Sequence, residues 1–275
     1  MDKIRQMKGL FRETGLHTVC ESAHCPNIGE CWGKGTATFM ILGDICTRGC
    51  RFCAIEAGRP LEVDLEEPRH VAEAIWKLNL RYVVITSVAR DDLPDEGAHQ
   101  FAKTIKAIHA LPGDIKVEVL IPDLSCRLEN LKVITDTKPE VMSHNIETIS
   151  RLSKKVRPQA EYERSLNVLR AIKQLDPALL TKSSFMVGLG ETHSEIIHLM
   201  EDLVTCGCDI LTVGQYLSPS PSKRHLPVER YATPQEFESY RNLGRELGFK
   251  YVMSGPLVRS SYIAEEGYRE CLAAV

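Results

Sequence analysis

The chain has 275 residues, 43% of them hydrophobic and 26% charged, which is enough to bury a large core in one domain with short extensions. Its formal net charge of -3 gives no overall basic excess, so composition argues against a nucleic-acid partner. No run of 18 apolar residues occurs, and the N-terminus lacks the apolar segment of a signal peptide, so we expect a cytoplasmic protein with no membrane contact.

The first 17 residues carry a short helical pattern, because apolar residues recur at helical spacing. These residues are Ile4, Met7, Leu10 and Phe11. We expect this helix to pack on the exterior of the main domain.

A first group of three cysteines, the N-terminal triad, follows at Cys20, Cys25 and Cys31 with the spacing C-x4-C-x5-C. Pro26 and Gly29 interrupt any helix here, so the segment is predicted to be a loop able to wrap a compact object. Such a pattern is weak by itself, but a second triad begins 15 residues after Cys31.

The second group, the central triad, is Cys46, Cys50 and Cys53 with the spacing C-x3-C-x2-C on a loop that contains glycine. Three thiolates can ligate three irons of a four-iron, four-sulfur (4Fe-4S) cluster, because soft sulfur matches soft iron. The fourth iron is then free to bind a small molecule. The alternative is a zinc site, although zinc sites usually combine paired C-x2-C or Cys/His sets.

The other four cysteines are scattered along the chain, and we expect them to be small buried hydrophobic residues rather than ligands. They are Cys126, Cys206, Cys208 and Cys271.

Beyond the triads, short apolar strands alternate with longer helical patterns. Strands are expected at residues 38–42, 82–86, 117–121, 141–144, 184–187 and 211–215, and helices at 71–78, 97–110, 165–174, 194–205 and 234–247. This alternation predicts an α/β fold with parallel strands and right-handed crossovers. Functional groups gather at the carboxyl ends of such strands, and the central triad follows the end of the first one.

The central triad, with aromatic Phe52 before its last cysteine, resembles the signature of the radical S-adenosylmethionine (SAM) superfamily. This resemblance implies an open, partial (β/α)6 barrel. It also implies that SAM chelates the open iron and is cleaved to a 5'-deoxyadenosyl radical, which abstracts hydrogen from unactivated carbon.

The two triads and a later Arg-Ser-Ser-Tyr segment together resemble the lipoyl synthase family. The similarity includes the segments at residues 86–95, 117–123, 144–148, 156–158, 187–192, 214–217 and 259–262. It implies a sulfurtransferase that places sulfur at C6 and C8 of an octanoyl chain carried on a lysine, with two SAM molecules consumed per lipoyl group.

The resemblance also implies a second, auxiliary 4Fe-4S cluster, held by the N-terminal triad and consumed as the sulfur donor. A serine of the Arg-Ser-Ser-Tyr segment would be its fourth ligand, and oxygen is a poor match for soft iron, which suits a cluster that must come apart. We favour Ser261, with Ser260 as the alternative. Without the triads, adjacent serines would indicate only a polar turn.

Polar residues after several strands are candidates for binding SAM. Arg90, Asp91 and Asp92 could hold its methionyl part, or form a solvated turn. Asn145 and Glu147 are suited to its ribose hydroxyls or amino group, or belong to a surface turn. Weaker candidates lie near a later strand, and these are Lys182 and Glu191.

We expect three segments: an extension at residues 1–35 with the N-terminal triad, a barrel at 36–250, and a C-terminal segment at 251–275. The expected partners are octanoylated carrier domains, namely 2-oxoacid dehydrogenase E2 subunits and the glycine cleavage H protein. An electron donor such as ferredoxin or flavodoxin and an iron-sulfur carrier for cluster repair are also implied. Other readings are a different sulfur-inserting radical SAM enzyme, an iron-sulfur electron carrier and a structural zinc module.

Overall fold

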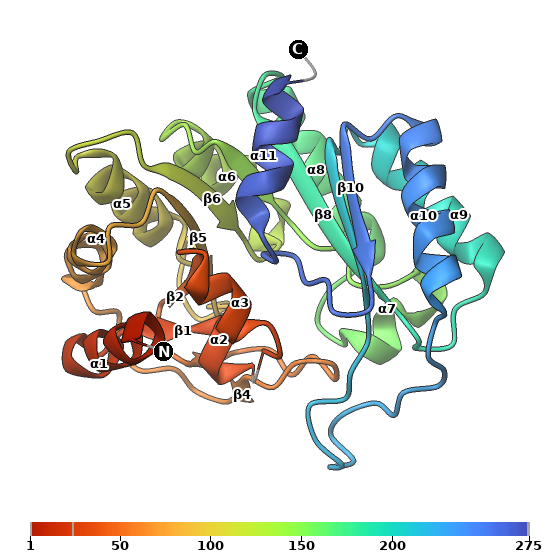
Figure 1. Cartoon of the computed structure of the whole chain (residues 1–275), viewed down its shortest axis with the longest axis horizontal. Helices are drawn as coiled ribbons and strands as arrows, with labels where there is room; N and C mark the ends of the chain where they lie inside the picture. Colours follow the sequence, from red (N-terminus) through yellow and green to blue (C-terminus); the bar gives the residue numbers. More distant parts are fainter. Residues whose placement is uncertain (1, 24, 274–275) are drawn as a thin grey trace.

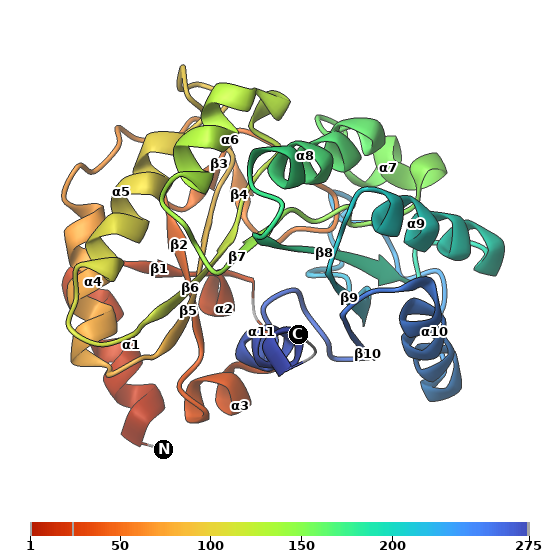
Figure 2. The same ribbon diagram turned by 90° about the horizontal axis from the view of Figure 1, so that it is seen from above.

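The computed structural model describes residues 2–23 and 25–273, and its centre is one open, curved sheet of eight strands (Figures 1 and 2). The strand order is β1-β2-β5-β6-β7-β8-β9-β10. Neighbouring strands from β2 to β10 are parallel, and β1 pairs with β2 antiparallel. The α/β class and the parallel sheet are therefore confirmed.

The strands of the main sheet are β1 His17–Thr18, β2 Ala37–Ile41, β5 Tyr82–Ser87, β6 Lys116–Leu120, β7 Val141–Ser143, β8 Leu180–Val187, β9 Ile210–Gln215 and β10 Tyr251–Gly255. A separate pair, β3 Ile45–Cys46 and β4 Glu56–Ala57, lies in the loop of the central triad. All six predicted strands are present. The sheet has one more parallel strand than the six predicted, because β10 pairs with β9 along its whole length.

The helices are α1 Asp2–Thr14, α2 Val19–Ser22, α3 Ile28–Gly33, α4 Glu67–Lys77, α5 Ala98–His109, α6 Leu128–Thr135, α7 Ser150–Val156, α8 Tyr162–Leu175, α9 His193–Thr205, α10 Pro234–Leu247 and α11 Ala264–Ala273, with a 3-10 turn at Leu124–Cys126. Helices α4 to α10 cover the outer side of the sheet, and α11 lies on its inner side (Figure 2).

One prediction about local structure was wrong. The N-terminal triad does not lie on a continuous loop, because α2 and α3 flank it. Pro26 lies between these helices, but Gly29 lies inside the first turn of α3, where nothing comes within 4 Å of the position of a Cβ atom. A single glycine weakens a helix by only about 1 kcal/mol relative to alanine, so the packing of Trp32 and Cys31 outweighs it.

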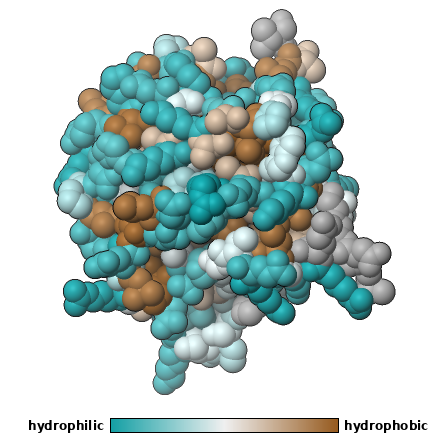
Figure 3. Space-filling view, turned by 90° about the vertical axis from the view of Figure 1, so that its left-hand side faces the viewer, coloured by the Kyte–Doolittle hydropathy of each residue, from teal (hydrophilic) through white to brown (hydrophobic). Residues whose placement is uncertain are grey.

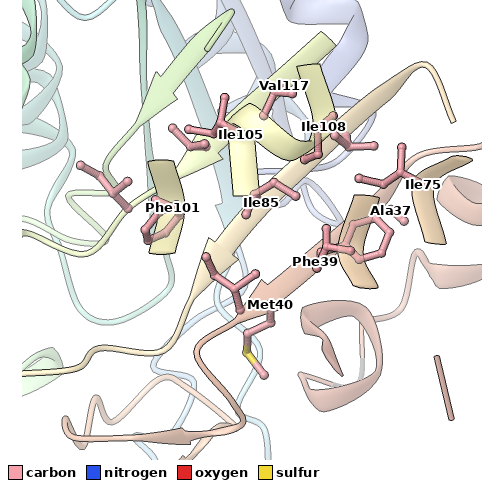
Figure 4. Packing of buried hydrophobic residues seen from close by; sticks show 14 of the residues in the cluster. Ala37, Phe39, Met40, Ile75, Ile85, Phe101, Ile105, Ile108 and Val117 are labelled. Atoms are coloured by element: carbon pink, nitrogen blue, oxygen red, sulfur yellow. The ribbon is translucent and has the colours of Figure 1, made fainter. Parts of the chain in front are cut away.

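The outer layer of the first half of the sheet is a packed apolar interface (Figure 4). Phe39 of β2 and Ile85 of β5 meet Ile75 of α4 and Phe101 and Ile105 of α5, and all five are buried. Burying one such side chain contributes about 1.5–3 kcal/mol. The alternate residues of β5, Tyr82 and Val84, instead face inward and contact α11 through Ala264.

The boundaries of α10 match the predicted range because the sequence contains both end signals. Thr233 and Glu236 form a capping box, and Pro234 occupies the first turn. Gly248 ends the helix with a φ of 104°. The face of the molecule in Figure 3 is mostly hydrophilic with scattered hydrophobic residues. No helix in the described part of the chain is both long and apolar enough to cross a membrane.

Candidate metal and cofactor site

The central triad lies where β2 ends, beside the end of β5. The main chain of Cys46 pairs with the β4 strand, and Thr47 N donates to Ala89 O at 3.1 Å, so the loop is fixed to the segment after β5. Two backbone amides, from Arg48 and Ala89, point at Cys46 Sγ at 3.4 and 3.3 Å. Amides directed at sulfur stabilise a bound thiolate or cluster.

Burial dominates the acidity of the other two thiols. It raises the pKa of Cys50 to about 12, and that of Cys53 to about 11. Neighbouring cysteines shift both in the same direction. The three thiols therefore form a compact, partly dehydrated set.

An ion-pair clamp holds this loop to two strand ends. Arg48 Nε lies 2.9 Å from Asp91 Oδ2, and Arg48 Nη2 lies 2.7 Å from Asp123 Oδ1. Asp123 follows β6, is 1% exposed and also contacts Arg164 at 3.3 Å. Although burial acts to raise it, hydrogen bonds from Arg48 hold the pKa of Asp123 below its usual value.

The residues predicted to hold the methionyl part of SAM are engaged within the protein. Arg90 is buried and donates to Leu42 O and Leu61 O, at 3.4 and 3.0 Å, and to the Asp92 carboxylate at 2.9 Å. Asp91 accepts from Arg48 and from Thr47 Oγ1, the latter at 2.6 Å. These contacts anchor the loop, and the SAM contacts of Arg90 and Asp91 stay predictions.

The pair predicted to bind the ribose or amino group lies just after β7. Asn145 Nδ2 donates to Glu147 Oε1 at 3.0 Å, and Asn145 Oδ1 is buried without a hydrogen-bond partner. Glu147 has a φ of 65°, a left-handed conformation that costs about 1–3 kcal/mol and is typical of functional sites. Burial raises the pKa of Glu147, and Arg157 opposes that shift. Cys50 and Cys53 both sense the Glu147 charge, so this pair lies beside the central triad.

The two weaker candidates have other partners. Lys182 Nζ lies 2.8 Å from Glu118 Oε1 in a buried pair that Tyr82 and Ser143 complete. Glu191 accepts from the backbone amides of Gly188 and Leu189 at 2.6 and 2.9 Å, which fixes the turn after β8. This geometry gives no support to either residue as a SAM contact.

The N-terminal triad faces the C-terminal segment across a cavity with an empty volume of about 300 Å³, part of it open to solvent. Its lining comprises Cys20, Cys25, Asn27, Ile28, Cys31, Thr36, Thr38, Arg259, Ser261 and Tyr262. Of the two serines considered, Ser261 lines this cavity and Ser260 is absent from its lining. Burial lowers the pKa of Arg259, and the neighbouring Cys25 opposes this shift, which places the guanidinium beside that thiol.

Two close contacts bring the C-terminal segment to this cavity. Asn27 Nδ2 donates to Leu257 O at 2.6 Å, and Tyr262 OH donates to Glu30 Oε2 at 2.9 Å. The segment then crosses Gly214 of β9, where a Cβ atom would lie 2.1 Å from Val258 O. Glycine is therefore required at position 214 for Ser261 to reach the triad.

Several residues at these sites were not assigned from the sequence. Arg48 and Arg157 lie inside recognised motifs, but nothing in their spacing reveals their partners. Asn27 lies within the N-terminal triad, and a hydrogen bond to a carbonyl 230 positions away leaves no local signal.

The predicted structural cysteines behave as expected in three cases, since Cys206, Cys208 and Cys271 are buried. Cys126 is half-buried and has a φ of 53° in a turn where Leu124 and Ser125 are also left-handed. The zinc alternative requires ligands that converge on one ion, and no three Cys, His, Asp or Glu side chains do so among residues 2–23 and 25–273.

The comparisons with known proteins agree with this geometry. The sequence profile of the radical SAM superfamily matches residues 40–203, so the protein is an enzyme of the radical SAM class that uses SAM and a 4Fe-4S cluster. Its similarity to curated relatives is closer still, and the chain belongs to the lipoyl synthase family.

The relatives cover nearly the whole chain. Lipoyl synthase of Caldanaerobacter subterraneus is 54% identical over 97% of this chain and 93% of its own length. Lipoyl synthase of Rubrobacter xylanophilus is 58% identical over 95% of this chain and 81% of its own length.

Solved structures show the same fold at low identity. Methylornithine synthase has a TM-score of 0.56 and 14% identity over 86% of this chain and 82% of its own. HydG, a maturase of the FeFe-hydrogenase, has a TM-score of 0.61 and 15% identity over 86% of this chain and 54% of its own.

Proposed function

We propose that this protein places two sulfur atoms at C6 and C8 of an octanoyl chain that is amide-linked to a lysine of a lipoyl carrier domain. SAM is cleaved to 5'-deoxyadenosine and methionine, and the auxiliary 4Fe-4S cluster is the sulfur donor. The observation that supports this proposal most directly is the cavity that Ser261 shares with Cys20, Cys25 and Cys31. Membership of the lipoyl synthase family supports it independently.

The two triads divide the work. Cys46, Cys50 and Cys53 hold the cluster that binds SAM, and they leave one iron open because the loop offers three thiolates. When bound, the clusters supply the electron for SAM cleavage and the sulfur for insertion. The residues around both sites favour such groups: amides point at Cys46 Sγ, and the N-terminal triad lines a cavity of suitable chemistry.

Polar residues of the barrel position SAM in this scheme. Asn145 has a buried acceptor atom free for a ligand hydroxyl or amino group, and Glu147 offers a carboxylate beside it. The Arg48 clamp keeps the loop of the central triad against β5 and β6, so the open iron faces the barrel interior. Fixed placement matters because a carbon radical must form beside the carbon that it attacks and away from water.

Ser261 is suited to a ligand that must be released. Oxygen binds soft iron weakly, so a hydroxyl can complete the auxiliary cluster without preventing its disassembly. Arg259 lies beside Cys25 and offers positive charge to an anionic cluster.

The proposed partners follow from this chemistry. The octanoyl-lysine substrates are carried by 2-oxoacid dehydrogenase E2 subunits and the glycine cleavage H protein. SAM cleavage needs a one-electron donor such as ferredoxin or flavodoxin. Each turnover consumes the auxiliary cluster, so an iron-sulfur carrier must rebuild it.

The test compares Ser261→Ala with Ser260→Ala after anaerobic reconstitution. Mass spectrometry of an octanoyl-lysine peptide, incubated with SAM and dithionite, measures the replacement of two hydrogens by two sulfurs. We expect Ser261→Ala to lower this product by about tenfold or more, as loss of a metal-supporting group typically does, while SAM cleavage persists. Ser260→Ala, whose side chain is absent from the cavity lining, should behave like the unmodified protein.

Two outcomes would overturn the proposal. Sulfur insertion unaffected by Ser261→Ala would remove this residue from the auxiliary site. SAM cleavage by the unmodified protein without any gain of sulfur would indicate a different radical reaction.

A further inference from the structure

Three segments with a strong positive charge meet around the loop of the central triad. They are residues 49–59 of the loop itself, residues 150–159 of α7 and its end, and residues 218–230 between β9 and α10. Together they contain nine Lys or Arg and two Glu, a formal charge of +7 in a chain whose total is -3. The positive charge is therefore concentrated at one place.

Hydrogen bonds join these segments through Arg51. Its backbone N donates to Val156 O at 2.8 Å, and its backbone O accepts from Leu226 N at 3.1 Å. Its side chain donates to the carbonyls of Arg224 and Lys223 at 3.3 and 3.4 Å. The 218–230 segment is thus fixed to the loop that carries the central triad.

Further contacts reach the triad itself. His225 Nε2 lies 3.0 Å from Cys53 O, and Arg224 donates to Ile55 O. On the other side, Gly49 N donates to Gln159 Oε1 at 3.2 Å. The positive segments therefore enclose the outer side of the metal-binding loop.

The basic side chains at the surface of these segments form a feature that we call the basic rim. It consists of Arg51, Lys154, Lys155, Lys223 and Arg224. Lys155 has one long contact, 3.9 Å to Glu229, and the other four make no salt bridge within the described part of the chain. Lys154, Lys155, Lys223 and Arg224 are exposed. Their charge is thus available to another molecule.

The rim also lacks an apolar centre. None of the large hydrophobic residues exposed in the described chain falls within residues 49–59, 150–159 or 218–230. Stable protein interfaces usually contain a buried apolar core. A charged surface without one fits a brief encounter that is steered by charge, and electron-transfer complexes are of this weak, small-area kind.

We propose that the basic rim is the docking surface for an acidic one-electron carrier protein that reduces the cluster held by the central triad. This inference rests on the proposed function, because that function requires one electron for each SAM cleaved. The carrier loses one electron, and the carbon-sulfur bond of SAM breaks to give methionine and the 5'-deoxyadenosyl radical. Positive charge around this loop attracts an acidic carrier to within a short distance of the cluster.

The test reverses charge at two exposed rim residues that make no structural contact. The variant is Lys154→Glu with Lys223→Glu. The matched control is Lys103→Glu with Lys106→Glu, which makes the same charge change on exposed positions of α5, away from α7 and the 218–230 segment (Figure 1). Arg51 and Arg224 are left intact because they hold the loop.

The first measurement is binding of purified flavodoxin, an acidic one-electron carrier, at several salt concentrations. We expect the rim variant to raise the dissociation constant by about tenfold at low salt, and the control to change it by less than about twofold. Raising the salt concentration should weaken binding by the unmodified protein and reduce the difference between it and the rim variant.

The second measurement is formation of 5'-deoxyadenosine with each reductant. The rim variant should be slower with flavodoxin and unchanged with dithionite, because dithionite is a small molecule that needs no docking surface. Equal loss with both reductants would place the lysines in the reaction itself and overturn the proposal. Unchanged flavodoxin binding by the rim variant would also overturn it.

A third measurement separates the carrier domain from the electron donor. Binding of an octanoylated H protein should be the same for the rim variant and the control. Weakened H protein binding with unchanged flavodoxin binding would assign the rim to the substrate carrier instead. Failure of the proposed function would appear as absence of sulfur insertion by the unmodified protein with dithionite, an assay in which the rim has no part.

Discussion

Arg48 Nη2 lies 2.7 Å from Asp123 Oδ1, and this contact joins the loop of the central triad to the end of β6. Both side chains are buried, with exposed fractions of 9% for Arg48 and 1% for Asp123. A buried charge that loses its partner is costly, so the contact links folding stability to the position of the metal-binding loop.

The first prediction concerns Asp123→Asn, which removes the charge that faces Arg48 and Arg164 but preserves the shape of the side chain. We expect the free energy of unfolding in urea to fall by about 3–5 kcal/mol. The iron bound after reconstitution should fall too. The control is Asp136→Asn, whose exposed contact with Lys132 should matter by less than about 1 kcal/mol. Equal effects of the two substitutions would contradict the clamp.

The second prediction concerns Gly214→Ala, because the new Cβ atom would lie 2.1 Å from Val258 O. The C-terminal segment must move, and Ser261 then leaves the cavity of the N-terminal triad. We expect iron and sulfide analysis to show loss of one cluster and retention of the other, with faster proteolysis near residue 258. Gly9→Ala is the control, since nothing lies within 4 Å of its Cβ position. Retention of both clusters by Gly214→Ala would sink this prediction.

The third prediction separates a structural from a SAM-binding role for Lys182. Lys182→Met leaves the Glu118 carboxylate charged and buried, so we expect a loss of about 3–5 kcal/mol of stability. Adding Glu118→Gln removes that charge and should restore part of the loss. The folded double variant should bind SAM with unchanged affinity in equilibrium dialysis. A large loss of SAM affinity in it would instead assign Lys182 to the cofactor.

The fourth prediction concerns pH and His144, whose ring lies 3.0 Å from both Ile121 O and Ser165 Oγ. Burial lowers the pKa of His144 to about 4, and Asp123 opposes this shift. In the unfolded chain a histidine has a pKa of about 6.5. Between these values the unfolded chain binds more protons, so this residue's contribution to stability, about 3 kcal/mol, is present above pH ~6.5 and is lost as pH falls toward 4.

The measurement compares the free energy of unfolding at about pH 5 and pH 7 for the unmodified protein and for His144→Asn. The variant has lower stability at neutral pH but should lose less of it on acidification, because asparagine does not titrate. Parallel pH dependences of the two proteins would show that His144 is not the titrating group.

The sequence alone determined much of the framework. Alternating apolar strands and amphipathic helices predicted six parallel strands, and the spacing of the central triad predicted a metal-binding loop at a strand end. The capping residues Thr233 and Gly248 predicted the ends of α10. These features depend on residues close together in the chain, so local propensity and periodicity are sufficient to find them.

The tertiary structure decided what depends on residues far apart. Strand β10 gains its state from pairing with β9, since its five residues, Tyr251–Gly255, are too few to be distinctive. Only the folded chain distinguishes Ser261 from Ser260, because the choice depends on how the segment crosses Gly214 and meets Asn27. Contacts across more than 200 residues are fixed by packing and by the absence of a side chain, and neither leaves a pattern in the local sequence.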